Sequence, residues 1–181
     1  MATERDWLDE GLAVLAEQGI PSVTIEVLCE RLGLTKGSFY HHFRGMAAYR
    51  AALLEHFETR FTTEFIDIAE SGAGASAGTR MERLLDLVTG KGDTAGLETA
   101  VRAWAQQDPL ARAVQERVDR RRIDYLGTLW RRRGGEEPET MARLLYLILV
   151  GAGHLVPSLT MSELREVYEL AVRPYAREER S

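Results

Sequence analysis

The sequence lacks several features that would direct it to a particular class of protein. Its single cysteine, Cys29, excludes an intramolecular disulfide and a cysteine metal cluster. The most apolar stretch, residues 144–156, is shorter than the roughly 20 residues that a transmembrane helix needs. The charged N-terminal segment has no apolar run of the kind found in signal peptides. We therefore expect a cytoplasmic protein without membrane contact.

An excess of positive charge is also missing. The chain carries 23 Lys and Arg against 28 Asp and Glu, which gives a formal net charge of −5. An acidic total is atypical of a protein that binds nucleic acid over its whole surface, so any DNA contact must come from a local patch. With 45% hydrophobic residues, the 181-residue chain can still form one ordinary domain, or a small domain joined to a larger one.

Motifs for catalysis and cofactor binding are absent as well. The glycines of residues 72–78 do not have dinucleotide-loop spacing, and residues 90–94 do not match a P-loop. His41 and His42 are adjacent, so on a helix they point about 100° apart and cannot share a simple metal site. We therefore predict no catalytic residue, no metal site and no cofactor.

Apolar residues recur at helical spacing along almost the whole chain, which predicts an all-α fold. The expected helices cover about residues 5–18, 25–32, 36–43, 46–70, 79–89, 94–107, 109–133, 137–155 and 162–177. The helix over 46–70 would be roughly 37 Å long and would join three short helices to a larger helical body. We therefore expect two domains, residues 1–45 and residues 46–181.

The stretch LGLTKGSFYHHF, residues 32–43, is poorly suited to a helix that only covers its own core. Gly37 in the first turn costs up to ~1 kcal/mol relative to alanine. Lys36 at the same end opposes the helix macrodipole by ~0.3–1 kcal/mol. Both residues become favourable beside a phosphate, because glycine permits close approach and lysine supplies the opposite charge. Two short helices joined by Gly-Leu-Thr also have helix-turn-helix spacing, although a solvated helix end would explain the pattern too.

Residues 5–54 resemble the DNA-binding domain of the TetR family of transcriptional regulators. The matching run is GIPSVTIEVLCERLGLTKGSFYHHF, residues 19–43. The resemblance implies an N-terminal three-helix helix-turn-helix domain and a larger C-terminal ligand-binding and dimerisation domain. It also implies a homodimeric repressor that binds a palindromic double-stranded DNA operator and responds to a small-molecule effector.

Carried over position by position, the resemblance implies a set of DNA-facing residues. They are Thr24, Thr35, Lys36, Gly37, Ser38, Tyr40, His41, His42 and Arg44. For His42, a phosphate contact and a partly buried packing role both stay open, whereas Phe39 and Phe43 should be core. Met46 stands where the family usually has lysine, and Arg44 is the expected substitute. Because residues 1–60 carry six basic and nine acidic residues, we expect modest, strongly salt-dependent DNA affinity.

The C-terminal body should hold the effector and the dimer interface. The candidate ligand-binding residues are Phe57, Phe61, Trp104, Arg121, Tyr125, Trp130, Tyr146 and His154. The helix over 137–155 is apolar on most sides and must be covered on several of them, in part by a second subunit. The candidate interface residues are Leu144, Ile148, Gly151, Leu164, Tyr168, Ala171 and Tyr175.

Two alternatives to a strong repressor stay open at this level. One is a diverged family member that binds an operator only weakly, because of Met46 and the acidic N-terminal region. The other is a helical ligand-binding protein or enzyme that uses a C-terminal cavity. Since no catalytic motif is present, we expect that the chain is not an enzyme.

Overall fold

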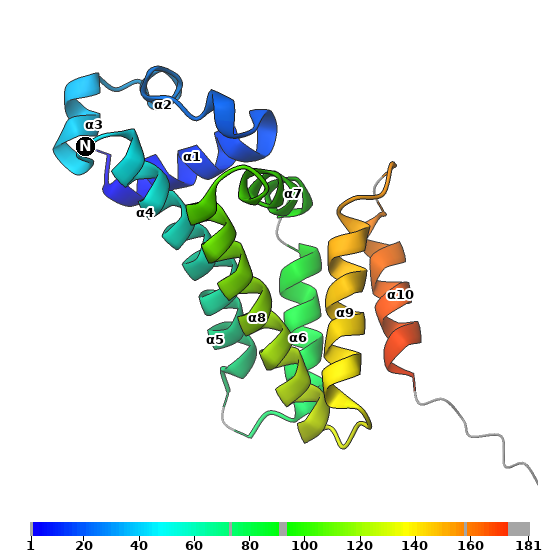
Figure 1. Ribbon diagram of the computed structural model, residues 1–181. Coiled ribbons are helices and arrows are strands. Elements are labelled where there is room, and N and C mark those ends of the chain that lie inside the picture. Colours follow the sequence, from blue (N-terminus) through cyan, green and yellow to red (C-terminus); the bar gives the residue numbers. More distant parts are fainter. Residues whose placement is uncertain (1, 73, 91–93, 158, 174–181) are drawn as a thin grey trace, which may run out of the picture.

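The computed structural model describes residues 2–72, 74–90, 94–157 and 159–173, and this part of the chain contains helices and no strand. Three short helices form a head: α1 (Glu4–Gln18), α2 (Ile25–Leu32) and α3 (Lys36–His42). Figure 1 shows this head at one end of the molecule and a bundle of longer helices below it. The predicted all-α fold, with a helix-turn-helix region followed by a helical body, is confirmed.

Side-chain caps and one glycine define the turn between α2 and α3. The Thr24 hydroxyl accepts the Val27 N–H at 3.3 Å and begins α2. Gly33 ends α2 with φ +65°, a left-handed conformation that favours glycine. The Thr35 hydroxyl then accepts the Ser38 N–H at 3.3 Å and begins α3. Local sequence therefore sets the helix-turn-helix geometry.

One rod of helix connects the head to the far end of the body. It consists of α4 (Met46–Glu58), the π-helical turn η2 (Thr59–Thr63) and α5 (Glu64–Glu70) (Figure 1). The sequence predicted an uninterrupted helix over 46–70, and the structure differs by the wider π turn in its middle. At this turn, Arg122 of α8 donates to the Phe61 carbonyl, so the backbone has a partner outside its own helix.

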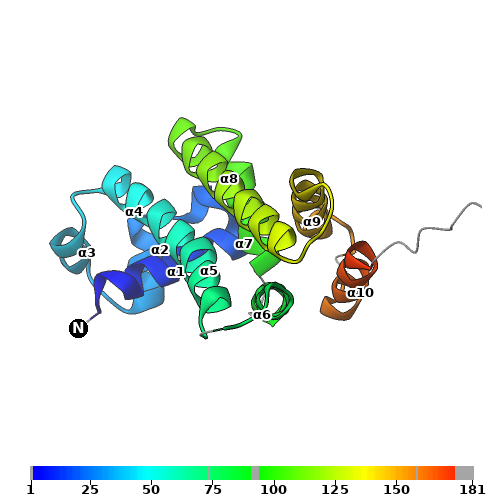
Figure 2. The same cartoon turned by 90° about the horizontal axis from the view of Figure 1, so that it is seen from below.

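The body contains α6 (Ala77–Gly90), α7 (Thr94–Ala105), α8 (Pro109–Arg132), α9 (Pro138–Ala152) and α10 (Met161–Val172). Figure 2 shows α10 beside α9 at the edge farthest from α3. The final helix was predicted to reach residue 177, but the backbone is extended at Arg173. The positions after Arg173 lie outside the described residues.

Two clusters of buried side chains form the core. The first joins the head to α4, α7 and the start of α8, and the second lies between α8 and α9. Tyr49 of α4 donates its hydroxyl to the Trp7 carbonyl at 2.7 Å. Gly11 is required for this contact, because a Cβ there would lie 1.9 Å from the Tyr49 hydroxyl. The predicted domain boundary after residue 45 therefore falls within one packed core, and it stays a prediction.

None of the helices in the described residues is both long and apolar enough to cross a membrane.

Candidate functional site

The helix α3 is buried on one face and exposed on the other. Phe39 is fully buried, and its ring centroid lies 5.6 Å from that of Trp7 and 5.4 Å from that of Tyr49. The opposite face exposes Thr35, Lys36, Gly37, Tyr40 and His41, with Tyr40 at 58%. Packing therefore presents the polar side of this short helix to solvent as one surface.

Gly37 lies at the exposed N-terminal turn of α3. An added Cβ would meet only the Thr35 hydroxyl, at an ordinary contact distance of 3.6 Å, among the described residues. Its φ lies outside the positive range that favours glycine. Nothing within the described chain therefore requires glycine at this position.

Lys36 is paired with a carboxylate from the preceding helix. Its Nζ lies 2.5 Å from Oε1 of Glu26, and both side chains are exposed. The hydrogen bond raises the pKa of Lys36 and lowers that of Glu26. Because exposed ion pairs contribute little, a phosphate can replace Glu26 as the partner of Lys36.

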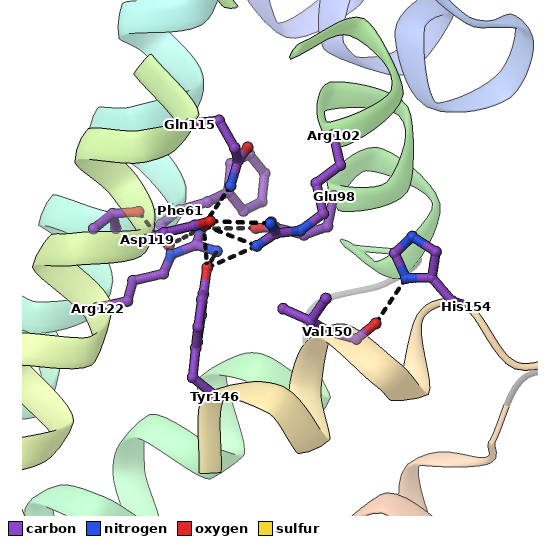
Figure 3. Close-up of polar contacts among 10 residues, drawn as sticks. Phe61, Glu98, Arg102, Gln115, Asp119, Arg122, Tyr146, Val150 and His154 are labelled. Atoms are coloured by element: carbon purple, nitrogen blue, oxygen red, sulfur yellow. Dashed lines mark hydrogen bonds and ion pairs between the residues drawn. The ribbon is translucent and has the colours of Figure 1, made fainter. Parts of the chain in front are cut away.

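A cavity of about 320 Å³ lies in the body between α5, α6, α8, α9 and α10. Most of its walls are apolar, and the π turn contributes Phe61 and Thr62. Arg122, Glu98 and Tyr146 also line it and belong to a group of polar side chains (Figure 3), in which Tyr146 is buried and the charged residues are half-buried. We refer to Glu98, Arg102, Asp119, Arg122 and Tyr146 as the polar cluster.

Asp119 accepts hydrogen bonds from three neighbours. Arg102 donates from Nη1 and Nη2 at 3.1 and 2.9 Å, Tyr146 from its hydroxyl at 2.7 Å, and Gln115 at 2.6 Å. Burial would raise the pKa of Asp119, but the bonds from Arg102 and Tyr146 outweigh it and leave the pKa below its ordinary value. Burial raises the pKa of Tyr146 to about 12. The aspartate is therefore ionised and the tyrosine neutral at pH 7.

Arg122 connects the cluster to the long rod. Its Nε donates to the Thr62 hydroxyl at 2.9 Å, and its Nη2 donates to the Phe61 carbonyl at 3.1 Å and to Glu98 at 2.7 Å. Burial would lower the pKa of Arg122, but the Glu98 carboxylate raises it above the ordinary value. A charged guanidinium thus contacts the π turn and the cavity at once.

Comparison with known proteins identifies the N-terminal region. Residues 8–53 match the model for bacterial regulatory proteins of the tetR family. A curated relative, the transcriptional regulator AcuR of Cereibacter sphaeroides, is 41% identical over 51 residues, which are 28% of this chain and 23% of AcuR. The head of the chain therefore matches the DNA-binding domain of the TetR family.

Solved structures extend the likeness of fold to the whole chain. A TetR/AcrR family regulator covers 94% of this chain and 98% of its own, at TM-score 0.80 and 20% identity. The match to Escherichia coli NemR in its reduced form covers 96% of this chain and 100% of NemR, at TM-score 0.75 and 20% identity. The match to a Saccharomonospora viridis regulator in complex with choline covers 92% of this chain and 93% of that regulator, at TM-score 0.77 and 16% identity. The match of the head to transcription regulators argues against the enzyme alternative.

The remaining DNA-facing candidates of this TetR-family head differ in exposure. Arg44 is exposed, while Thr24 and Ser38 are half-buried at the helix starts. The imidazole Nε2 of His42 lies 3.2 Å from the Ala2 carbonyl, which favours the packing role for this residue. Met46 packs against the core, so it supplies neither charge nor a polar contact on this surface.

The cavity brings together some of the predicted ligand-binding residues. Phe61, Tyr125 and Tyr146 line it. Phe57 and Trp104 are instead buried in the first core cluster, because α7 packs against α1 of the head.

Three further candidates lie away from the cavity and have partners of their own. Trp130 donates from Nε1 to a backbone carbonyl at 2.9 Å, and the exposed Arg121 donates to the Thr63 hydroxyl at 2.7 Å. His154 is exposed, and its Nδ1 lies 2.8 Å from the Val150 carbonyl (Figure 3).

Sequence reasoning chose Arg121 and missed its neighbour. Arg122 lies four residues after Val118 and four before Leu126, both of which are buried, so it shares their face of α8. That spacing in the sequence therefore indicates that Arg122 faces inward. Glu98 carried no comparable signal, because its role depends on a partner from another helix.

The predicted interface residues divide between two faces. Leu144 and Gly151 are exposed and Ile148 is half-buried, all on one side of α9. Leu164 is buried, Tyr168 lines the cavity and Ala171 packs against the second core cluster. Tyr175 lies outside the described residues.

Proposed function

We propose that the chain is a homodimeric, ligand-responsive DNA-binding regulator that represses transcription from a palindromic operator. The observation that carries this proposal is Gly37, a glycine in the exposed first turn of α3 for which the described chain has no steric need. Glycine would be needed if an external group approached this end of the helix too closely for a Cβ atom to fit. A DNA phosphate is such a group, because helix N-termini bind anions.

The rest of the exposed α3 face suits a DNA major groove. Thr35, Tyr40 and His41 offer hydrogen-bonding groups, and Lys36 offers a charge once it leaves Glu26. A recognition helix inserts its N-terminal residues between base edges while neighbouring groups hold phosphates. The acidic head and the apolar Met46 leave few cations for phosphates, so binding should weaken steeply as salt rises.

A second copy of the chain is the partner we propose for the outer edge of the body. Leu147 of α9 is 65% exposed and Leu170 of α10 is 62% exposed. Leu144, Gly151 and Val167 continue the exposed strip on the same two helices. Large exposed apolar side chains on two packed helices are the kind of surface that a protein partner covers. The packing favours Leu147, Val167 and Leu170 over Leu164 and Tyr168 as interface residues.

The cavity is the proposed effector site because the rod that leads to the head forms part of its wall. Phe61, Thr62 and Phe65 of the rod line the cavity. Arg122 bonds to the π turn from the same cavity, and Arg117 of α8 donates from Nε to both Glu58 oxygens at 3.0 Å. A ligand that binds one arrangement of these contacts more tightly than another would shift the rod, and with it the spacing of the two heads.

Selection from a pool of random DNA duplexes tests the proposal. Purified chain should enrich a palindrome, and fluorescence anisotropy at two salt concentrations should give an affinity that falls with salt. A Lys36→Ala variant should bind more weakly, whereas Arg120→Ala, which removes an exposed cation of the body, should bind as the unmodified chain does. If no sequence is enriched even at low salt, the operator-binding function is wrong. Weak enrichment only at low salt would favour the diverged-member alternative.

A further inference from the structure

The charge balance and the donors around the cavity indicate a chemical class of ligand. We propose that the cavity binds an uncharged, largely apolar molecule with one hydrogen-bond acceptor oxygen directed to Arg122. This inference rests on the proposed function of the cavity as the effector site. It is carried by the juxtaposition of an apolar chamber with a neutral, incompletely satisfied polar end.

The walls select an apolar body. The helices α5, α6, α8, α9 and α10 all contribute hydrocarbon or aromatic surface, including Phe65, Met81, Leu84, Leu126, Leu149 and Tyr168. A ligand that displaces water from these side chains gains roughly 25 cal/mol for each Å² of apolar surface it buries. The volume of about 320 Å³ suits a small molecule rather than a peptide or a long lipid chain.

The polar end has no net charge to offer. Arg122 is paired with Glu98 at 2.7 Å, and Arg102 is paired with Asp119 at 2.9 Å. An incoming carboxylate would meet Glu98 beside the guanidinium, and an incoming ammonium would meet Arg122 beside the carboxylate. Burying such a charge without its own partner is costly, so the site disfavours ions of both signs.

Arg122 nevertheless has donor capacity to spare. Its Nη1 carries two N–H groups, yet among the described residues its hydrogen bond is a long one, 3.5 Å to the Tyr146 hydroxyl. The Tyr146 oxygen is better engaged elsewhere, since it donates to Asp119 at 2.7 Å and accepts from Arg102 at 2.8 Å. A carbonyl, ether or hydroxyl oxygen of a ligand would complete the Arg122 donors without adding charge.

The other charged groups around the cavity do not overturn this balance. Glu82, Glu169 and Arg133 are exposed, and Arg165 is half-buried. They comprise two charges of each sign on more solvated parts of the wall, where water screens them. The polar cluster, which is less exposed than these groups, therefore decides which ligands are accepted.

Three probes of nearly equal size test the proposed class by isothermal titration calorimetry on the full chain. They are 4-phenylbutan-2-one, 3-phenylpropanoate and 3-phenylpropylammonium, which share a phenyl group and differ in the charge of the polar end. The ketone should bind at least about tenfold more tightly than either ion, since desolvating an unpaired charge costs more than 1.4 kcal/mol. Equal or tighter binding of either ion, or undetectable binding of the ketone, would overturn the proposal.

Variants locate the binding. Leu84→Trp narrows the cavity with an indole ring and leaves the polar cluster intact, so it should weaken ketone binding while circular dichroism shows retained helix. Arg122→Lys keeps a positive partner for Glu98 but removes the forked guanidinium donor, so it should weaken ketone binding. The ketone affinity of this variant should approach that of butylbenzene, an apolar molecule of similar size. Unchanged ketone affinity in a folded Leu84→Trp protein would overturn the site.

Measuring operator affinity with and without the ketone distinguishes failure of the proposed ligand class from failure of the proposed regulatory function. If the ketone fails to bind while the selected duplex still binds with salt-dependent affinity, the ligand class is wrong and the DNA-binding function stands. If the ketone binds in the cavity as expected but does not change operator affinity, the ligand class stands and the proposed response is wrong.

Discussion

Replacing Gly37 by alanine should change fold stability and DNA affinity in opposite directions. The added methyl group would meet only the Thr35 hydroxyl, 3.6 Å away, among the described residues. Alanine favours the helix by up to ~1 kcal/mol over glycine. At about 2–4 °C per kcal/mol for a chain of this size, thermal unfolding should occur up to about 4 °C higher. A phosphate held at this helix end would clash with the methyl group, so we expect operator affinity to fall by about tenfold or more, the equivalent of one lost charge-assisted hydrogen bond.

Gly78 provides a matched control for this experiment. It lies at the same position in the first turn of α6, and its added Cβ would meet the Ser76 hydroxyl at the same 3.6 Å. Because Gly78 lines the cavity, operator affinity is measured without ligand. Gly78→Ala should then raise the unfolding temperature similarly without changing operator affinity. Differential scanning calorimetry and fluorescence anisotropy on the same preparations give both quantities. If Gly37→Ala binds the operator as tightly as the unmodified chain, our reasoning about this helix end is refuted.

Other features of the structure lead to three further predictions. Lys36→Ala should lower the slope of log affinity against log salt by about one, whereas Glu26→Gln should strengthen operator binding because it frees Lys36. Equal slopes for Lys36→Ala and the unmodified chain would show that Lys36 does not contact a phosphate. Leu147→Glu should convert the proposed dimer to a folded monomer in sedimentation equilibrium, and a persistent dimer would exclude the α9 edge as the interface. The pKa of Asp119 is lower in the folded chain than its ordinary value of 3.8. The ionised carboxylate therefore stabilises the fold at pH values above 3.8, and this contribution is lost as pH falls through the folded pKa. Urea unfolding of a folded Asp119→Asn variant should therefore depend less on pH below about 4, and an unchanged dependence would contradict the assignment.

Local sequence signals were sufficient for the fold and for the exposed and buried faces of α3. The caps Thr24 and Thr35 and the turn residue Gly33 act within a few residues of their own positions, so the sequence predicts their structure directly. The spacing of Phe39 and Phe43 likewise predicted the buried face of α3. The helices were therefore predicted within a few residues of their observed ends, wherever the structure describes them.

The cavity was less predictable because it depends on contacts between distant helices. Trp104 has the same local pattern as a cavity residue, but α7 turns toward α1 and buries it in the other core cluster. Arg122 resembles Arg121 in composition, and only its register with Val118 and Leu126 separates the two. Its pairing with Glu98 joins residues 24 apart in the chain, which no local period encodes.

Footprinting of the chain on its selected duplex tests the central claim most directly. A homodimer that reads a palindrome should protect two major-groove segments about 10 base pairs apart, the spacing of successive turns of DNA. The Leu147→Glu monomer should give much weaker protection of the same segments. A single protected segment, protection without sequence preference, or unchanged protection by the monomer would contradict the account of the chain as a dimeric operator-binding regulator.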